Sequence, residues 1–179
     1  SLFNADLSAA TERVKSHSVV RETLLLRQPP ETLVISVEER EPVATVSRRD
    51  GLSGLDREGT LFTLPLAPLD LPVITGIEVL DCDSLMLVEK VLPDLAAFFG
   101  ELEREAPAFL DGVSEVCVES TQEVRVYLVG DVLQLRMRLS DPSDQARNFQ
   151  AYLTSRTCLQ GAPAYVDLRF EHQVVIGRL

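Results

Sequence analysis

The sequence is poor in the residues and motifs that most often perform chemistry. Its two histidines, His17 and His172, fall in opposite parts of the chain, and no G-x-S-x-G nucleophile motif accompanies either of them. No phosphate-binding G-x-x-x-x-G-K-[ST] loop is present, because the glycines follow turn spacing. The acidic clusters at 38–41 and 101–105 are explained better by a solvated strand end and a solvated helix face than by paired acid and base. We therefore predict no enzyme activity, no cofactor and no metal site.

Cysteine is also scarce. Cys82, Cys117 and Cys158 are too few for a disulfide framework, and none has the C-x-x-C spacing of zinc or redox sites. At least one of them is unpaired within the chain. Because Cys117 stands between two valines, we expect it to be a small buried apolar side chain. One bridge from Cys82 to either of the other two stays open in an oxidising compartment.

Long apolar runs and an excess of positive charge are absent as well. No segment reaches the roughly 18 apolar residues of a membrane span, and no signal-peptide pattern opens the sequence. The 17 lysines and arginines face 28 acidic residues, for a net charge of -11, which argues against a nucleic-acid binder. With 45% hydrophobic residues in 179, the chain can form one ordinary domain or two small ones. We expect a soluble protein or a soluble part of a larger one.

The first part of the sequence predicts a helix on a small three-stranded sheet. Residues 4–16 have helical spacing, with Asn4 or Asp6 as the cap, and residues 19–27 and 32–46 have strand patterns. Within the second pattern, Leu33, Ile35 and Val37 alternate with more polar residues, so one face is expected to be buried and the other wet. Pro42 cannot donate to a ladder and predicts an edge or a break there.

A proline-rich stretch at 64–72 predicts a boundary between a first domain, 1–71, and a second, 72–179. The second domain begins with a long helix from Ser84, which Pro93 is expected to kink or split. A hairpin follows over 124–139 with Gly130-Asp131 at its turn, then a helix opened by Asp141-Pro142 with Ala146, Phe149 and Leu153 inward, and two strands at 164–170 and 173–176. The predicted class is α+β, and the second domain has an extended, mostly antiparallel sheet.

Four motifs in order resemble one known family. Residues 27–44 and 56–62 follow the pattern R-x-P-x-T-L-x-I-x-V-x-E-R-x-P-V-A and then D-x-x-G-x-x-F, residues 71–76 resemble LP-x-x-x-G, and residues 165–170 resemble VDLR-Y, followed by a last strand. The chain resembles the FtsQ family of bacterial cell division proteins, called DivIB in some lineages, which combine a POTRA domain with a β domain. The strand and helix that open a complete POTRA domain are missing before Ser1, either because the sequence is truncated or because the protein lacks them.

This resemblance implies a non-enzymatic scaffold of the divisome, anchored in the inner membrane by a single helix that precedes the sequence, with this region on the periplasmic or extracytoplasmic side. It implies that FtsB (DivIC) and FtsL partners add a strand at the last strand of the β domain, residues 169–177 here, and that upstream division proteins bind the POTRA domain. The alternative is a POTRA-type module that binds polypeptides in outer-membrane assembly or transport.

The matching segment supplies the candidate partner-binding residues. If it is one edge strand, Phe170, His172, Val174 and Ile176 point one way, and Glu171, Gln173 and Val175 point the other. The pattern does not say which set packs on the core and which meets a partner. Phe170 is either a core aromatic or an interface anchor. Arg169 matches the arginine of the family and is expected to clamp an acidic residue of the partner. Arg136 and Arg138, which share one face of their strand, are two further candidates for such a clamp. His172 is expected to be exposed, and Arg40 and Glu41 are expected to be mainly structural.

Overall fold

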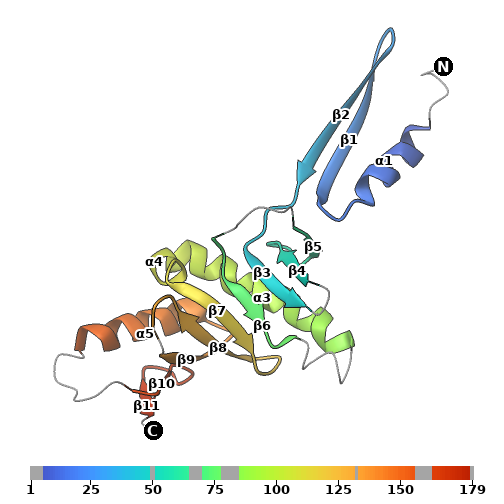
Figure 1. Ribbon diagram of the computed structural model, residues 1–179. Coiled ribbons are helices and arrows are strands. Elements are labelled where there is room, and N and C mark those ends of the chain that lie inside the picture. The colour runs from blue at the N-terminus through green and yellow to red at the C-terminus, as the bar shows by residue number, and fades with distance from the viewer. Residues whose placement is uncertain are drawn as a thin grey trace.

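The computed structural model describes residues 6–48, 51–64, 70–77, 85–131, 133–155 and 163–177. A small N-terminal unit projects from a larger body that is built on one wide sheet (Figure 1). The class is α+β, as predicted. Among the described helices, none is both long enough and apolar enough to cross a membrane.

The N-terminal unit consists of the helix α1 (Leu7–Lys15) and the antiparallel strands β1 (Val20–Gln28) and β2 (Thr32–Glu39). Asp6 caps the helix, because its carboxylate accepts hydrogen bonds from the backbone N–H groups of Ser8 and Ala9 at 2.9 and 3.1 Å. The helix and the first two strands confirm the prediction. The small sheet, however, has two strands rather than the three expected.

The expected third strand belongs to the body. After a break at residues 40–43, β3 (Ala44–Arg48) pairs with β4 (Gly51–Leu55) and with β6 (Val73–Thr75). The break is at Pro42, as predicted. Two fully buried side chains, Ala44 and Val46, hold β3 in the core of the body, which the hairpin unit cannot offer.

The predicted buried face of β2 is also wrong. Ile35 and Val37 are 50% and 45% exposed, whereas Leu25 on β1 is buried. The reason is that α1 is only nine residues long and packs against β1, so that among the described residues no second layer lies over β2. Alternation decides which side chains share a face, but burial requires an opposing layer.

The body contains a nine-stranded sheet with the order β11-β10-β9-β8-β7-β6-β3-β4-β5. Its other strands are β5 (Leu61–Thr63), β7 (Val113–Val118), β8 (Glu123–Leu128), β9 (Gln134–Arg138), β10 (Tyr165–Asp167) and β11 (Val175–Gly177). The pairs β3–β6, β6–β7 and β9–β10 are parallel, and the remaining pairs are antiparallel. The hairpin of β8 and β9 confirms the prediction. The sheet continues across residue 72 through the pairing of β3 with β6, and the domain boundary there stays a prediction.

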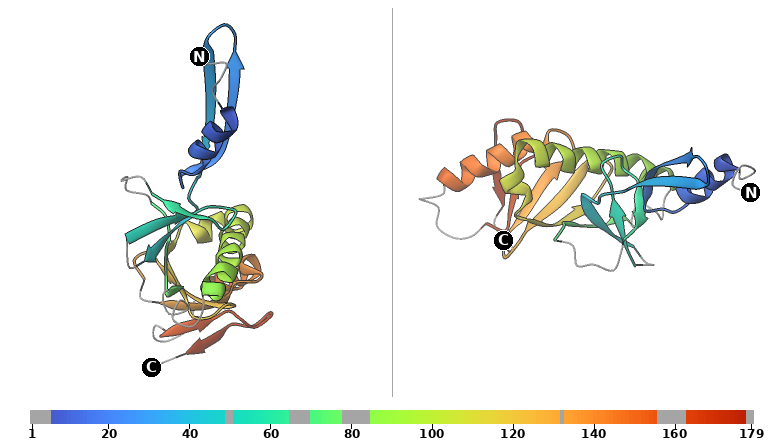
Figure 2. Two further views of the ribbon diagram at one scale, coloured as in Figure 1. Left: turned by 90° about the vertical axis from the view of Figure 1, so that its right-hand side faces the viewer. Right: turned by 90° about the horizontal axis from the view of Figure 1, so that it is seen from above.

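One long helix covers the sheet. Figure 2 shows α3 (Leu85–Glu105) along one face of it, where Leu95, Phe98 and Leu102 are fully buried against the strands. Of the two outcomes expected at Pro93, a kink or a split, the split is wrong, because the helix is continuous through this residue. Pro93 points to solvent, and burial of the neighbouring apolar side chains stabilises the helix on both sides of it.

Two shorter helices complete this layer, α4 (Pro107–Leu110) and α5 (Pro142–Ser155). Ala146 and Phe149 of α5 are buried as predicted, but Leu153 is 40% exposed and Tyr152 is buried in its place. Cys117 of β7 is half-buried rather than buried, and its thiol is free. Cys82, Cys158 and Ser84 lie outside the described residues.

An ion pair joins the break at 40–43 to the body. The guanidinium of Arg40 contacts the carboxylate of Asp56, which is 1% exposed and also accepts the backbone N–H groups of Glu58 and Thr60 at 3.1 and 2.7 Å. The next turn includes Gly59, with φ +80°, where an added Cβ would lie 2.9 Å from the backbone of Pro93. The residues of the E-R-x-P-V-A and D-x-x-G motifs are therefore tied together as structure, as expected for Arg40.

Candidate partner-binding site

The candidate site lies at the C-terminal edge of the sheet. β10 pairs in parallel with β9 on one side and antiparallel with β11 on the other, and β11 is the last strand in the order. Within the described residues, the outer side of β11 has no strand beside it. This edge is three residues long and shorter than the segment 169–177 that the resemblance implied, because residues 168–174 form a bend, a turn and irregular backbone.

The backbone of β10 shows which groups of β11 face outward. The N–H of Leu168 donates to the carbonyl of Arg136 at 2.9 Å, so Leu168 and Val166 direct their backbone groups toward β9. Tyr165 and Asp167 then direct theirs toward β11, where they pair with Gly177 and Val175. Ile176 lies between Val175 and Gly177 on β11, so its backbone N–H and C=O point away from β10, toward the open edge.

An aromatic side chain covers the solvent-facing side of the sheet at this edge. Tyr165 lies opposite Gly177, where an added Cβ would overlap its ring carbons, so the ring extends across the glycine. The guanidinium carbon of Arg136 lies 4.0 Å from the centroid of the same ring. Arg136, Tyr165 and Gly177 therefore form one layer across three strands.

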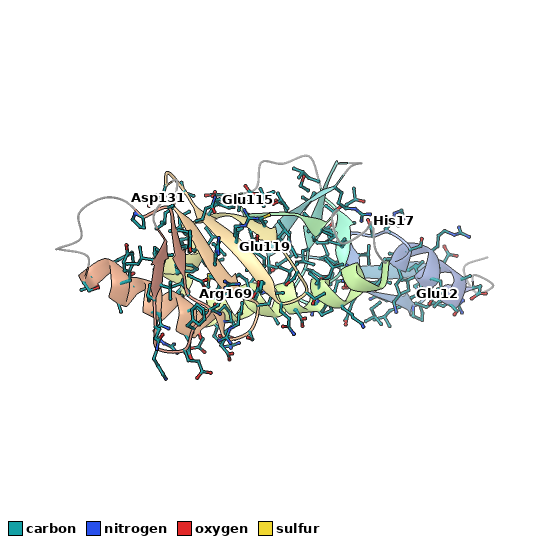
Figure 3. The ribbon with its side chains drawn as sticks, turned by 90° about the horizontal axis from the view of Figure 1, so that it is seen from below. Glu12, His17, Glu115, Glu119, Asp131 and Arg169 are labelled. Atoms are coloured by element: carbon teal, nitrogen blue, oxygen red, sulfur yellow. The ribbon has the colours of Figure 1, made fainter. Side chains whose placement is uncertain are left out.

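Charged side chains form a network beside this layer. Arg169 donates to both carboxylate oxygens of Asp167, from Nε at 2.9 Å and from a terminal nitrogen at 2.6 Å, and its other terminal nitrogen lies 2.8 Å from Glu123. Arg136 and Arg138 lie opposite Asp167 and Glu123 in the strand register. Arg136 and Arg169 thus lie beside Asp167, and Arg138 lies opposite Glu123 without an ion pair to it, so guanidinium groups outnumber carboxylates in this network. Figure 3 shows Arg169 at this end of the molecule, far from His17 in the N-terminal unit.

The network shifts the pKa of two of its members. Burial by itself raises the pKa of Asp167, but the hydrogen bonds from the side chain and the backbone N–H of Arg169 outweigh it, and the pKa is lowered. The hydrogen bond to Asp167, with that to Glu123, raises the pKa of Arg169. Both groups are therefore charged at neutral pH, and Arg169 is held in place before any partner binds.

A hollow of about 430 Å³ opens next to the network, at the end of β10 and along α5. It is lined by residues of three elements, among them Arg138, Arg147, Leu168, Phe170 and His172. Within the described residues, the side chain of Arg138 makes no ion pair or hydrogen bond, and its Nε is buried without a partner. Arg147 is paired with Asp144 on the same helix.

The structure separates the predicted site residues into three groups. Arg136, Arg138 and Arg169 gather on the wet face, as their patterns imply. Phe170, 48% exposed, and His172, exposed with φ +56°, lie in the loop between β10 and β11. Val174 and Ile176 pack against the core, so their side chains do not face a partner across the wet face. The expectation that all four residues from Phe170 to Ile176 share one strand face is therefore wrong.

Sequence reasoning did not identify Tyr165 or Arg147, and it left open whether the face with Val175 meets the core or a partner. Val175, 42% exposed, is the apolar side chain of β11 on the wet face. A signal for Tyr165 was present, because an aromatic residue at the start of a strand near the chain end can cover a glycine across the sheet. Arg147 carried no such signal, since only the folding of α5 onto β9 places it beside the hollow.

The geometry defines a class of protein surface: an open strand edge, with unpaired backbone groups flanked by basic and aromatic side chains, of the kind that accepts a strand from another protein. Within the described residues, no group of three or more His, Cys, Asp or Glu side chains is arranged to hold a metal ion.

Comparison with known proteins finds relatives among bacterial cell division proteins. The chain is 25% identical to the cell division protein FtsQ of Syntrophotalea carbinolica over 98% of its own length and 26% identical to FtsQ of Geotalea daltonii over 99%. A shorter match, 38% identical over 41% of the chain, is to FtsQ of Mycolicibacterium smegmatis. Over nearly its whole length, the chain is therefore similar to FtsQ-type bacterial cell division proteins.

Three further findings complete the comparison. The chain spans 63% and 66% of the length of the first two relatives, just under two thirds. The major extracytoplasmic domain of the division protein DivIB from Geobacillus stearothermophilus matches 68% of this chain and 99% of its own, with a TM-score of 0.42 and 20% identity. No protein-family model matches the chain.

Proposed function

We propose that this chain is the extracytoplasmic region of a single-pass inner-membrane scaffold of the bacterial divisome, that it is not an enzyme, and that it recruits FtsB- and FtsL-type partners by strand addition at β11. Upstream division proteins would bind the N-terminal unit. The similarity of the chain to FtsQ cell division proteins supports the role in division. A module for outer-membrane assembly is not favoured, because the curated relatives reported above are all cell division proteins.

The observation that carries this proposal is the outward N–H and C=O of Ile176 at the end of a nine-stranded sheet. A partner strand that hydrogen-bonds to these groups extends the sheet without any change in the core. Its side chains then alternate between the two faces, so that every second one lies over the wet face beside Val175 and the arginines. An acidic side chain there would be attracted by the excess of guanidinium groups.

A matched pair of variants tests the backbone mechanism. Ile176→Pro removes the outward N–H, and Ile176→Ala removes most of the same side chain while it keeps that N–H. The probe is the extracytoplasmic C-terminal segment of the FtsB-type protein from the same organism, titrated by calorimetry. We expect Ile176→Pro to weaken binding at least about tenfold more than Ile176→Ala does, since each 1.4 kcal/mol is tenfold.

The fold is checked in the same samples by amide NMR spectra. If the two variants bind the probe equally well while their spectra outside residues 163–177 match the parent, strand addition at this edge is refuted. If both lose binding to the same degree, the side chain of Ile176 rather than its N–H determines the affinity, and the backbone mechanism is equally refuted.

The guanidinium groups need a separate test. Arg138 is the suitable position, because its side chain has no partner within the described residues and its loss breaks no internal ion pair. We expect Arg138→Gln to weaken binding about three- to tenfold and to reduce the dependence of affinity on salt. Arg104→Gln, at an exposed position of α3 outside the hollow, serves as the control for the same change of charge elsewhere. An unchanged salt dependence in Arg138→Gln would exclude this arginine as a contact of the partner.

A further inference from the structure

A second concave surface lies at the other end of the strands. Because β3, β6 and β7 are parallel to one another, the first residues of these strands lie at the same end of the sheet. At this end, residues 41–43 and 70–72 form one wall of a cavity of about 530 Å³, and the end of α3 with α4 forms the other. The candidate site described above uses β11 and the opposite ends of β9 and β10, so the two surfaces share no lining residue.

The inner part of this cavity is apolar. The buried side chains of Phe99 and Val113 lie at its base, and Leu71 and Leu110 are partly exposed along its walls. Val129, at the end of β8, is 69% exposed at the rim, which is the largest exposure among the large apolar side chains described. An aliphatic side chain of a ligand can therefore be removed from water here.

The rim is acidic and largely unpaired. Glu41, Asp70 and Asp111 line the cavity, and within the described residues none of these carboxylates makes an ion pair or accepts a hydrogen bond. The one arginine in the lining, Arg57, is already paired with Glu103 at 2.8 Å. Counting Glu103, four carboxylates thus surround the apolar base, and the charge of one of them is balanced by Arg57. The remaining negative charge attracts an approaching cation and repels an anion.

We propose that this cavity, which we call the junction groove, is a docking site for a basic segment of another protein in which lysine or arginine residues alternate with aliphatic ones. The aliphatic side chains would enter over Phe99 and Val113, and the cationic ones would pair with Glu41, Asp70 and Asp111 at the rim. Charge complementarity selects this occupant, because the net charge of the groove repels acidic peptides and nucleic acids. The proposal does not depend on strand addition at β11.

The probe is an acetylated and amidated hexapeptide of alternating leucine and lysine, added to the isotopically labelled chain and followed by amide NMR. We expect shifts at residues 41–43, 70–72, 110–114 and 129, and an affinity that falls as salt is added. A hexapeptide with glutamate in place of lysine is expected to bind at least about tenfold more weakly, since its charges are repelled.

Two triple variants with the same change in net charge decide whether the groove is specific. Glu41→Gln/Asp70→Asn/Asp111→Asn neutralises the rim, and Glu12→Gln/Glu31→Gln/Glu171→Gln neutralises three exposed carboxylates elsewhere. We expect at least a tenfold loss of affinity in the first and less than a twofold loss in the second. Equal losses, shifts spread over the whole acidic surface, or no binding at all would overturn the proposal.

The apolar part is tested with Val129→Ser, which changes an exposed side chain and leaves the core intact. We expect a three- to fivefold loss of affinity for the leucine–lysine hexapeptide. If this variant binds as tightly as the parent and a peptide of lysine and serine binds equally well, the groove attracts only charge, and docking of an aliphatic segment is refuted.

Discussion

The N-terminal unit and the nine-stranded body have strands of similar composition but very different burial. In the body, Ile74, Leu135 and Met137 are completely buried between the sheet and its helices, while in the unit Leu24 and Leu26 are 56% and 52% exposed. The difference is the second layer. The body has the 21-residue helix α3 and the 14-residue helix α5 over one face, whereas the unit has nine residues of α1 over one of its two strands. A strand pattern therefore stabilises the fold only as far as another layer covers it.

The comparison is tested most directly by removing one apolar side chain from each region. Phe98 is fully buried and packs edge-to-face against Phe99, so Phe98→Ala is expected to lower the free energy of unfolding by about 3–5 kcal/mol. Ile35→Ala in the unit is expected to cost less than about 1 kcal/mol, because the side chain is already half exposed. Urea denaturation followed by circular dichroism measures both values. Equal losses would show that β2 is covered in solution.

The junction between the regions is expected to give the next largest effect. Asp56→Ala leaves Arg40 without its carboxylate and two backbone N–H groups without an acceptor, so we expect a loss of about 3 kcal/mol. Glu58→Ala is the control, since the pair of Glu58 with Arg21 is solvent-exposed and worth about 1 kcal/mol or less. Urea denaturation compares the two. A loss of less than 1 kcal/mol in Asp56→Ala would contradict a structural role for this ion pair.

A smaller effect is expected from the ionised network at the C-terminal edge, and it depends on pH. The pKa of Asp167 is lower in the folded chain than in the unfolded chain, so its contribution to stability is present above the unfolded value near 4 and disappears as pH falls through the lower folded value. We expect the free energy of unfolding of Asp167→Asn to fall less steeply than that of the parent between pH 5 and pH 2. Parallel curves would mean that the pKa of Asp167 is the same in both states.

The smallest effect is expected on the open face of the unit. Leu24 faces away from α1, because it alternates along β1 with the buried Leu25. Leu24→Ser is expected to change the free energy of unfolding by no more than about 0.5 kcal/mol and to leave the spectrum of the body unchanged. Leu25→Ser, one residue further on, is the matched control and is expected to destabilise the unit. A large effect of Leu24→Ser would identify a partner surface within the chain.

Elements stabilised by local contacts were the most predictable from the sequence. The hairpin of β8 and β9 joins neighbouring segments through a turn at Gly130, whose φ is +72°, and the cap of α1 depends on Asp6 and the three residues after it. Errors arose where distant segments compete. The sequence has no local signal that β3 leaves the hairpin for β6, since both sheets accept an apolar strand.

The candidate site shows the same division. The three arginines were identified because their positions on the strands, or the family motif, point to them. The strand edge was predicted at the last strand, where the structure has β11, but over too long a segment, since residues 170–174 have strand-like alternation but form a loop. The contacts that organise the edge, such as the ring of Tyr165 across Gly177, join segments whose register is set only when β10 and β11 pair.

By itself, the sequence determined the class of the fold, most of the helices and strands, and the resemblance to FtsQ proteins, because periodicity, caps and motifs are written in neighbouring residues. Only the tertiary structure decided which sheet β3 joins, which apolar faces are covered, that the backbone of Ile176 faces outward, and that four carboxylates from distant segments surround one groove. The physical reason is that burial, strand pairing and charge proximity are relations between segments far apart along the chain, and the whole fold selects them together.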